Sequence, residues 1–258
     1  MLTTIEVDFA AGTATITLNR LHRKNAMSFG MVREVYETLS AIAARPDIHV
    51  VILTGAGGWF CPGGDIEAVL NGETEEDIAA GYSAATFRVP ALLHEMPQLT
   101  IAAINGPCAA AGLGWALACD LRFASTTAKF STAFLDRGFA GDMSVPWTLP
   151  RIVGSGMARA LSFLPAKLDP TRALAIGLVN DVFAQGEFAD RLDAIVRRLL
   201  GFEPKALRTL KAHYVAAERM QLVDYCDHET RALPTNVREN AAGFASFLSA
   251  ERDQAGPG

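Results

Sequence analysis

Two glycine-bearing segments, at 61–66 and 105–114, constrain this chain more than any other feature of its sequence. Each follows an apolar run with strand character, at 50–54 and 100–104 respectively, and each leads into a stretch with helical character. The first N–H groups of a helix have no partner within it, and the helix dipole favours a negative charge there. Two such corners can each direct one N–H group at a single carbonyl oxygen, which makes an oxyanion hole.

Strand-like and helix-like patterns alternate through the first half of the chain. Residues 5–9 and 14–19 alternate in polarity around a glycine turn, which predicts a hairpin. Residues 28–45 carry apolar side chains at helical spacing. Further strands are predicted at 50–54, 100–104 and 121–124. Strands that alternate with helices favour parallel βαβ units, so the sequence predicts an α/β fold.

From about Gly154 the spacing of apolar residues becomes helical throughout. The helical pattern is clearest at 192–200, 205–220 and 236–250. The sequence therefore predicts an α/β core at 1–200 and a smaller C-terminal helical region at 201–258.

Composition excludes several classes of function. The chain has 258 residues, half of them apolar, and a net charge of −5, which disfavours a nucleic-acid partner. A signal-peptide profile and an apolar run long enough to span a membrane are both absent from the sequence, so we expect a cytoplasmic protein with no membrane partner.

The four cysteines lack the spacing of metal ligands, and no metal site is expected. Reduced, buried thiols are the favoured interpretation. Cys61 and Cys108 lie beside the glycine corners, which leaves a nucleophilic thiol open, although no histidine lies near either in sequence.

Six segments in order resemble the crotonase (enoyl-CoA hydratase/isomerase) superfamily over essentially the full length. They are LNR at 18–20 with KNA at 24–26, VILTG at 51–55, FCPGGDI at 60–66, IAAING at 101–106, ACDLR at 118–122 and LPRIVG at 149–154. The resemblance implies a spiral of βαβ units with a C-terminal helical domain that mediates trimerisation. It also implies homotrimers or hexamers, acyl-CoA thioester substrates, and no cofactor beyond the coenzyme A of the substrate.

The resemblance also places the site. It makes the backbone N–H groups of Gly64 and Ala111 the two oxyanion donors, which suits a thioester carbonyl that becomes enolate-like during the reaction. It implies further substrate contacts at Arg23, Lys24, Ala26, Gly63, Asp65, Ile66, Gly112 and Phe134. Of the nearby acids, Asp65 is expected mainly to cap the following helix, and Asp120 is expected to be structural.

The chain departs from the two-glutamate pattern of the hydratases. Adding water across a double bond needs a base and an acid, yet the two glutamate positions fall on Gly114 and Phe134. A carboxylate does occur on the following loop, at Asp142, where isomerase-like branches of the superfamily carry a single aspartate. Chlorobenzoyl-CoA dehalogenases share that aspartate, but their additional histidine corresponds to Phe87, and His94 is out of register.

Isomerisation by a single-carboxylate proton shuttle is therefore the leading functional prediction, with Gly64 and Ala111 holding the enolate and Asp142 moving the proton. Burial beside Phe134, Phe139 and Trp147 would raise the pKa of Asp142. Two alternatives stay open. The chain could be a non-catalytic acyl-CoA-binding protein on the same fold, or a water-adding or hydrolytic enzyme that uses Asp142 alone.

Overall fold

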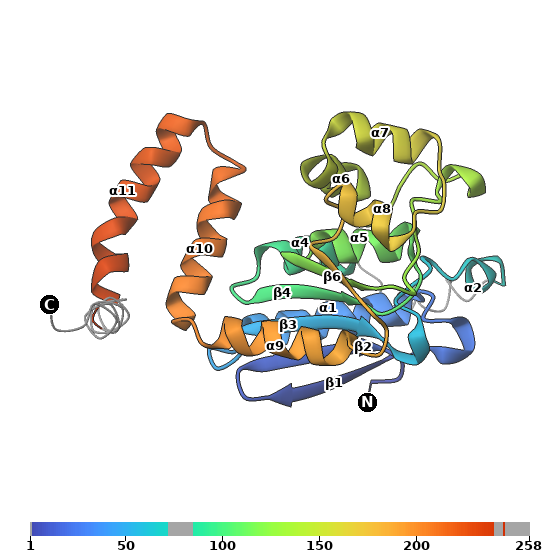
Figure 1. The fold of residues 1–258 in the computed structure, drawn as a ribbon, viewed down its shortest axis with the longest axis horizontal. Coiled ribbons are helices and arrows are strands. Elements are labelled where there is room, and N and C mark those ends of the chain that lie inside the picture. Colours follow the sequence, from blue (N-terminus) through green and yellow to red (C-terminus); the bar gives the residue numbers. More distant parts are fainter. Residues whose placement is uncertain (1, 72–84, 240–244, 246–258) are drawn as a thin grey trace, which may run out of the picture. The chain divides into compact units, whose positions relative to one another are not determined.

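The computed structural model describes residues 2–71, 85–239 and 245. Within these residues the main sheet has six strands, in the order β1-β2-β3-β4-β6-β8, with β1 at one edge (Figure 1). The strands are β1 (Ile5–Ala10), β2 (Thr13–Leu18), β3 (Val50–Gly55), β4 (Leu99–Ile104), β6 (Leu121–Ser125) and β8 (Asp181–Phe183). β1 and β2 form the predicted antiparallel hairpin, and every later neighbour is parallel. The predicted α/β fold is confirmed.

Helices connect and cover the parallel strands. The helices before the C-terminal region are α1 (Phe29–Ala43), α2 (Ile66–Leu70), α4 (Val89–Glu95), α5 (Ala110–Ala118), α6 (Val145–Val153), α7 (Ser155–Phe163) and α8 (Pro170–Ala175). In α1, the Ser28 hydroxyl caps the first turn by accepting a hydrogen bond from Met31 N–H at 3.1 Å. The apolar stripe of α1 is buried in the core, as its helical spacing predicts.

Two short strands, one before and one after β6 (Leu121–Ser125) in the chain, form a second sheet. β5 (Cys108–Ala109) pairs in parallel with β7 (Phe130–Ser131). β5 leads directly into α5, a helix that is buried along nearly all of its length. Its apolar residues alternate with glycines rather than forming one stripe, because neighbouring chain segments pack on several sides of it.

The prediction of helix throughout the region after Gly154 is wrong at β8. Asp181 and Phe183 pair with Phe123 and Ser125 of β6 and extend the main sheet. A three-residue strand is too short to show an alternating pattern, and its pairing with β6 depends on contacts distant in sequence.

The chain forms two compact units, Met1–Val196 and Arg197–Gly258. The helix α9 (Phe188–Leu200) includes the boundary between them, and the second unit contains α10 (Pro204–Ala217) and α11 (Leu222–Glu239). The helices predicted at 192–200 and 205–220 correspond to α9 and α10. Most of the helix predicted at 236–250 lies outside the described residues.

Candidate active site

The two glycine corners meet beyond the carboxyl ends of β3 and β4, which are neighbouring parallel strands. Cys61 and Cys108 form a parallel bridge between them. Cys61 N–H donates to the carbonyl of Pro107 at 3.1 Å, and Ala109 N–H donates to the carbonyl of Cys61 at 2.9 Å. Ligands of parallel α/β sheets bind at this end of the strands, so the fold places both corners where a site is expected.

Gly64 and Ala111 supply the N–H groups that the sequence predicts as oxyanion donors. Ala111 lies in the first turn of α5, and no described residue accepts a hydrogen bond from its N–H or from that of Gly64. Gly63 adopts φ +110°, and a Cβ there would lie 3.5 Å from Ala111 N, so the two corners are in contact. One donor of this kind contributes roughly 3 kcal/mol to stabilising an oxyanion in the transition state.

An apolar cavity of about 320 Å³ opens beside these two N–H groups. Gly64 and Ala111 both line it. Most of its wall is apolar, and the larger side chains are Met27, Phe29, Val32, Ile66, Phe87, Phe134, Phe139 and Met143. Among the lining residues that the structure describes, the charged ones are Asp65, Arg137 and Asp142. A cavity of this size and character suits a small apolar group with one polar end.

Asp142 contributes a carboxylate to the cavity wall from a loop whose residues at 138–142 are exposed. Its Oδ1 accepts a hydrogen bond from Met143 N–H at 2.7 Å. Desolvation by the surrounding atoms raises the pKa of the Asp142 carboxyl, and the hydrogen bond from Met143 offsets only part of that effect. Phe134 and Phe139, which the sequence predicts beside Asp142, line the same cavity.

Trp147, the third aromatic residue predicted near Asp142, is absent from the cavity wall. It lies on α6 and is 42% exposed, and its ring meets His94 edge-on with 5.3 Å between ring centroids. Arg151 lies 3.7 Å from the centre of the same ring. His94 is therefore directed to α6, whereas Phe87 occupies the cavity wall, and none of the described lining residues of the cavity is a histidine.

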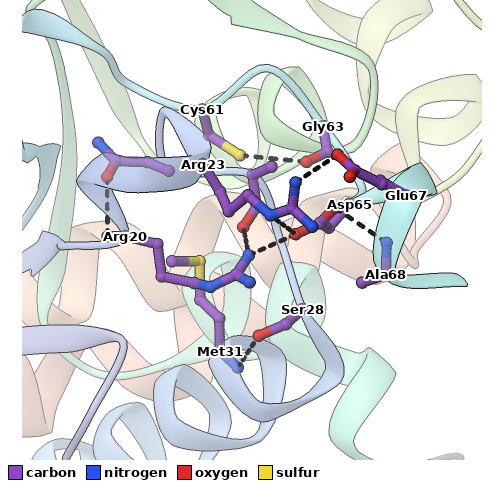
Figure 2. Close-up of polar contacts among 11 residues, drawn as sticks. Arg20, Arg23, Ser28, Met31, Cys61, Gly63, Asp65, Glu67 and Ala68 are labelled. Atoms are coloured by element: carbon purple, nitrogen blue, oxygen red, sulfur yellow. Dashed lines mark hydrogen bonds and ion pairs between the residues drawn. The ribbon is translucent and has the colours of Figure 1, made fainter. Parts of the chain in front are cut away.

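Asp65 joins the first corner to the loop that precedes α1. Figure 2 shows Arg20 and Arg23 converging on its carboxylate, at 2.9 Å and 3.4 Å respectively. The other carboxylate oxygen accepts a hydrogen bond from Ala68 N–H at 3.2 Å, which is the helix-capping role predicted for this residue. Burial alone would raise the pKa of Asp65, but the Ala68 N–H and the two guanidinium groups outweigh it and lower that pKa.

The loop at 20–26 is shaped by a buried amide. Asn25 Oδ1 accepts a hydrogen bond from Arg20 N–H at 2.9 Å, and its Nδ2 donates to the carbonyls of Ala56 and Trp59. Lys24 and Asn25 both have positive φ, which turns this loop back toward the glycine corner. Met27 then pairs with the corner itself, through hydrogen bonds to Gly63 and from Asp65.

A second, more polar pocket of about 270 Å³ adjoins the apolar cavity. Arg23, Lys24 and Ala26, which the resemblance assigns to substrate binding, are among its lining residues. The Arg23 guanidinium also pairs with Glu67, and Lys24 Nζ lies 4.9 Å from the centre of the Trp59 ring. The two cations predicted for ligand binding are therefore each directed at a protein group.

Arg137 is a lining residue that sequence reasoning missed. It lines both the apolar cavity and the polar pocket, and no ion pair joins it to another described residue. It ends a short 3-10 turn at Leu135–Arg137, far in sequence from the loop at 20–26. Nothing local in the sequence marks it, because only the fold brings the two segments to one pocket.

The remaining predicted positions are placed as follows. Gly64, Asp65 and Ile66 line both spaces, whereas Gly63 and Gly112 line neither. A Cβ at Gly112 would lie 2.3 Å from the Cys61 carbonyl oxygen, so glycine at this position allows the two corners to pack in contact. The carboxylate of Asp120 accepts hydrogen bonds from the N–H and hydroxyl groups of Thr100, as expected for a structural role.

The buried thiols beside the corners are unsuited to nucleophilic attack. Burial raises the pKa of the Cys61 thiol to about 12 and raises that of Cys108 as well. Cys119 is also buried, and Cys226 is exposed on α11.

Across the described part of the chain, no cluster of three or more His, Cys, Asp or Glu side chains could hold a metal ion. The described helices are all too short or too polar to cross a bilayer.

Two known proteins match this chain over nearly its whole length. The chain is 32% identical to 4-chlorobenzoyl coenzyme A dehalogenase-2 of Arthrobacter sp, over 96% of this chain and 91% of the relative. It is 30% identical to 1,2-epoxyphenylacetyl-CoA isomerase of Escherichia coli (strain K12), over 94% of each chain.

A solved structure shares the fold. The structure of a Thermobifida fusca YX protein in complex with acetoacetyl-CoA matches with a TM-score of 0.81 and 26% identity, over 92% of this chain and 95% of the other. The family model for enoyl-CoA hydratase/isomerase matches residues 8–254. The chain therefore belongs to the enoyl-CoA hydratase/isomerase family.

Proposed function

We propose that this protein isomerises acyl-CoA thioesters by moving a proton along the acyl chain. The thioester carbonyl oxygen is held by the N–H groups of Gly64 and Ala111, and the acyl chain enters the apolar cavity. Asp142 removes a proton from one carbon, the electron pair moves toward the carbonyl oxygen, and the same carboxyl returns a proton to another carbon. The double bond shifts, and no atom is gained or lost.

One observation carries the proposal: the cavity wall combines two N–H groups, which donate to no described residue, with the carboxylate of Asp142. The other acid among the described lining residues, Asp65, is held by Arg20, Arg23 and Ala68 N–H. Apolar surroundings raise the pKa of Asp142, which brings it closer to the working range of a proton shuttle. The polar pocket next to Gly64 provides an entry for the coenzyme A part of the substrate, and a relative of this chain binds acetoacetyl-CoA.

The residue types at the two glutamate positions argue against hydration by a pair of glutamates, since positions 114 and 134 carry glycine and phenylalanine. Dehalogenation is a second candidate because of the Arthrobacter relative, whose substrate is a 4-chlorobenzoyl thioester. The cavity disfavours it, because Phe87 lines the wall at the position where the resemblance to dehalogenases places a histidine.

Exchange of acyl protons tests the proposal directly. The protein is incubated in deuterated water with a panel of saturated and unsaturated acyl-CoA thioesters, and incorporation of label is followed by mass spectrometry. We expect exchange in the wild type and a loss of at least about 100-fold in Asp142→Asn, the usual contribution of a positioned base. Asp136→Asn is the matched control, because Asp136 lies in the preceding 3-10 turn, outside both lining sets.

The alternatives give different results in the same assay. Incorporation of oxygen from heavy-oxygen water would indicate a water-adding or hydrolytic enzyme. Tight binding of acyl-CoA with no exchange and no turnover, unaffected by Asp142→Asn, would indicate a binding protein. Release of chloride from 4-chlorobenzoyl-CoA would favour dehalogenation.

Assembly as a homotrimer or hexamer in the cytoplasm completes the proposal. Exposed apolar side chains on α11, including Leu222 and Val223 at 77% and 73% exposed, support a role of the C-terminal helices in association. Light scattering after size-exclusion chromatography measures the mass, and a monomer at micromolar concentration would contradict the assembly.

A further inference from the structure

Gly114 lies directly beneath the loop that carries Asp142. It is buried in the middle of α5, and a Cβ built there would lie 2.4 Å from the Met143 carbonyl oxygen and 2.7 Å from Met143 Cβ. Real side chains do not approach backbone atoms so closely. The backbone of Met143 therefore occupies the space that any side chain at position 114 would need.

The segment pressed against Gly114 has an unusual backbone. Met143 and Ser144 have φ of +46° and +62°, a region that non-glycine residues adopt rarely and at a cost. Met143 is only 5% exposed, whereas Gly141, Asp142 and Ser144 are exposed. Met143 is thus the residue that anchors this loop on α5.

Both the carboxylate and the main-chain carbonyl of Asp142 accept hydrogen bonds from neighbouring residues. Its carboxylate accepts the hydrogen bond from Met143 N–H at 2.7 Å, and its carbonyl accepts one from Val145 N–H at 3.1 Å, at the start of α6. A displacement of Met143 away from α5 would therefore carry the Asp142 carboxylate with it.

We propose that Gly114 is a positioning residue for the reaction, because the absence of a side chain at 114 seats Met143 on α5 and so sets Asp142 against the acyl cavity. The inference rests on the proposed function, in which Asp142 moves the proton. It also means that a glutamate at 114 and the observed position of Asp142 are mutually exclusive in this chain. Replacing Gly114 with glutamate, the residue that hydratases carry at this position, would displace Asp142, the acid that this site uses.

The test compares Gly114→Ala with wild type for acyl-proton exchange and for binding of free coenzyme A. Misplacement of a reacting group by about 1 Å can reduce a rate by about 100-fold, so we expect a loss of that size with coenzyme A affinity unchanged. We also expect the acidic limb of the pH–rate profile to move to lower pH, since a displaced Asp142 is better solvated. A merely structural effect would leave that limb in place.

Two further variants keep the inference separable from the proposed function. In an Asp142→Asn background, Gly114→Ala is expected to cause no additional loss, because its effect passes through Asp142. Gly156→Ala is the control, since a Cβ there would meet no atom within 4 Å beyond its chain neighbours and the backbone of its own helix. Full exchange activity in Gly114→Ala would overturn the inference alone, whereas full activity in Asp142→Asn would overturn the proposed function.

The contact is also tested from the loop side, in case Gly114→Ala does not fold. Met143→Gly keeps the positive φ and Gly114 but removes the anchoring side chain, and Met143→Leu keeps its bulk. We expect reduced exchange, and an acidic limb of the pH–rate profile shifted to lower pH, in Met143→Gly only. Equal behaviour of both variants and wild type would overturn the inference.

Discussion

The Arg20 guanidinium and the Asp65 carboxylate form a buried ion pair, with Nη1 and Oδ2 2.9 Å apart (Figure 2). Arg20 lies in the loop after β2, and Asp65 lies in the corner after β3. The same Arg20 nitrogen also donates to the Ala26 carbonyl. This pair therefore joins two of the chain segments that line the polar pocket.

Replacing Asp65 should destabilise the protein in a pH-dependent way. Its pKa is lowered in the folded state, so its contribution is complete above the unfolded value of about 4 and is lost as the pH falls through the folded value. We expect Asp65→Asn to cost on the order of 3 kcal/mol at pH 7, because it leaves a buried guanidinium without its charge partner. Urea unfolding at pH 7 and near pH 3 measures the loss.

The difference between Asp65→Asn and wild type should shrink at the lower pH. An equal loss at both pH values would show that the ion pair is not the cause. Asp47→Asn serves as a control, since the Arg45–Asp47 pair is exposed on both sides and is expected to change stability little.

Replacing Asp142 should have the opposite effect on stability. Its pKa is raised in the folded state, so the folded protein binds the proton more tightly and loses stability as the pH rises through the raised value. We expect Asp142→Asn to increase the midpoint of thermal unfolding at pH 7, with a smaller gain near pH 4. A decrease at pH 7 would contradict the raised pKa.

Arg137 should contribute to binding of the coenzyme A part of the ligand. Arg23 is held by Asp65 and Glu67, so Arg137, which lines the same pocket, is better placed to meet a phosphate. We expect Arg137→Gln to weaken acyl-CoA binding about tenfold, which is about 1.4 kcal/mol, and to leave binding of the corresponding pantetheine thioester unchanged. Calorimetry with both ligands measures this.

An equal loss for both ligands would instead place Arg137 on the acyl part. Arg23→Gln is the comparison variant, and a larger effect there than at Arg137 would contradict the assignment of the phosphate contact.

The thiols should differ sharply in reactivity. Cys61, Cys108 and Cys119 are buried, and the pKa of Cys61 is about 12, whereas Cys226 is exposed. We expect one thiol per chain to react rapidly with a disulfide reagent at pH 8, and none to react rapidly in Cys226→Ser. Rapid modification of Cys61 would require an opening of the corner region.

Local patterns in the sequence predicted the parts of this fold that have local causes. The hairpin of β1 and β2, the capped helix α1 and the two strand–glycine–helix corners each arise from residues within a few positions of one another. The helix-capping role of Asp65 was predictable for the same reason. The short strand β8 was not, because its three residues become a strand only by pairing with β6.

The sequence by itself determined the family. It also predicted the two N–H donors at Gly64 and Ala111, and it carries glycine and phenylalanine at the two positions where the resemblance places the hydratase glutamates. Only the tertiary structure decided how the site is completed. It brought Arg137 to the loop at 20–26, directed Trp147 to His94, and seated Met143 on Gly114. Those relationships join segments that are far apart in the chain, and packing between them leaves no periodic or local trace in sequence.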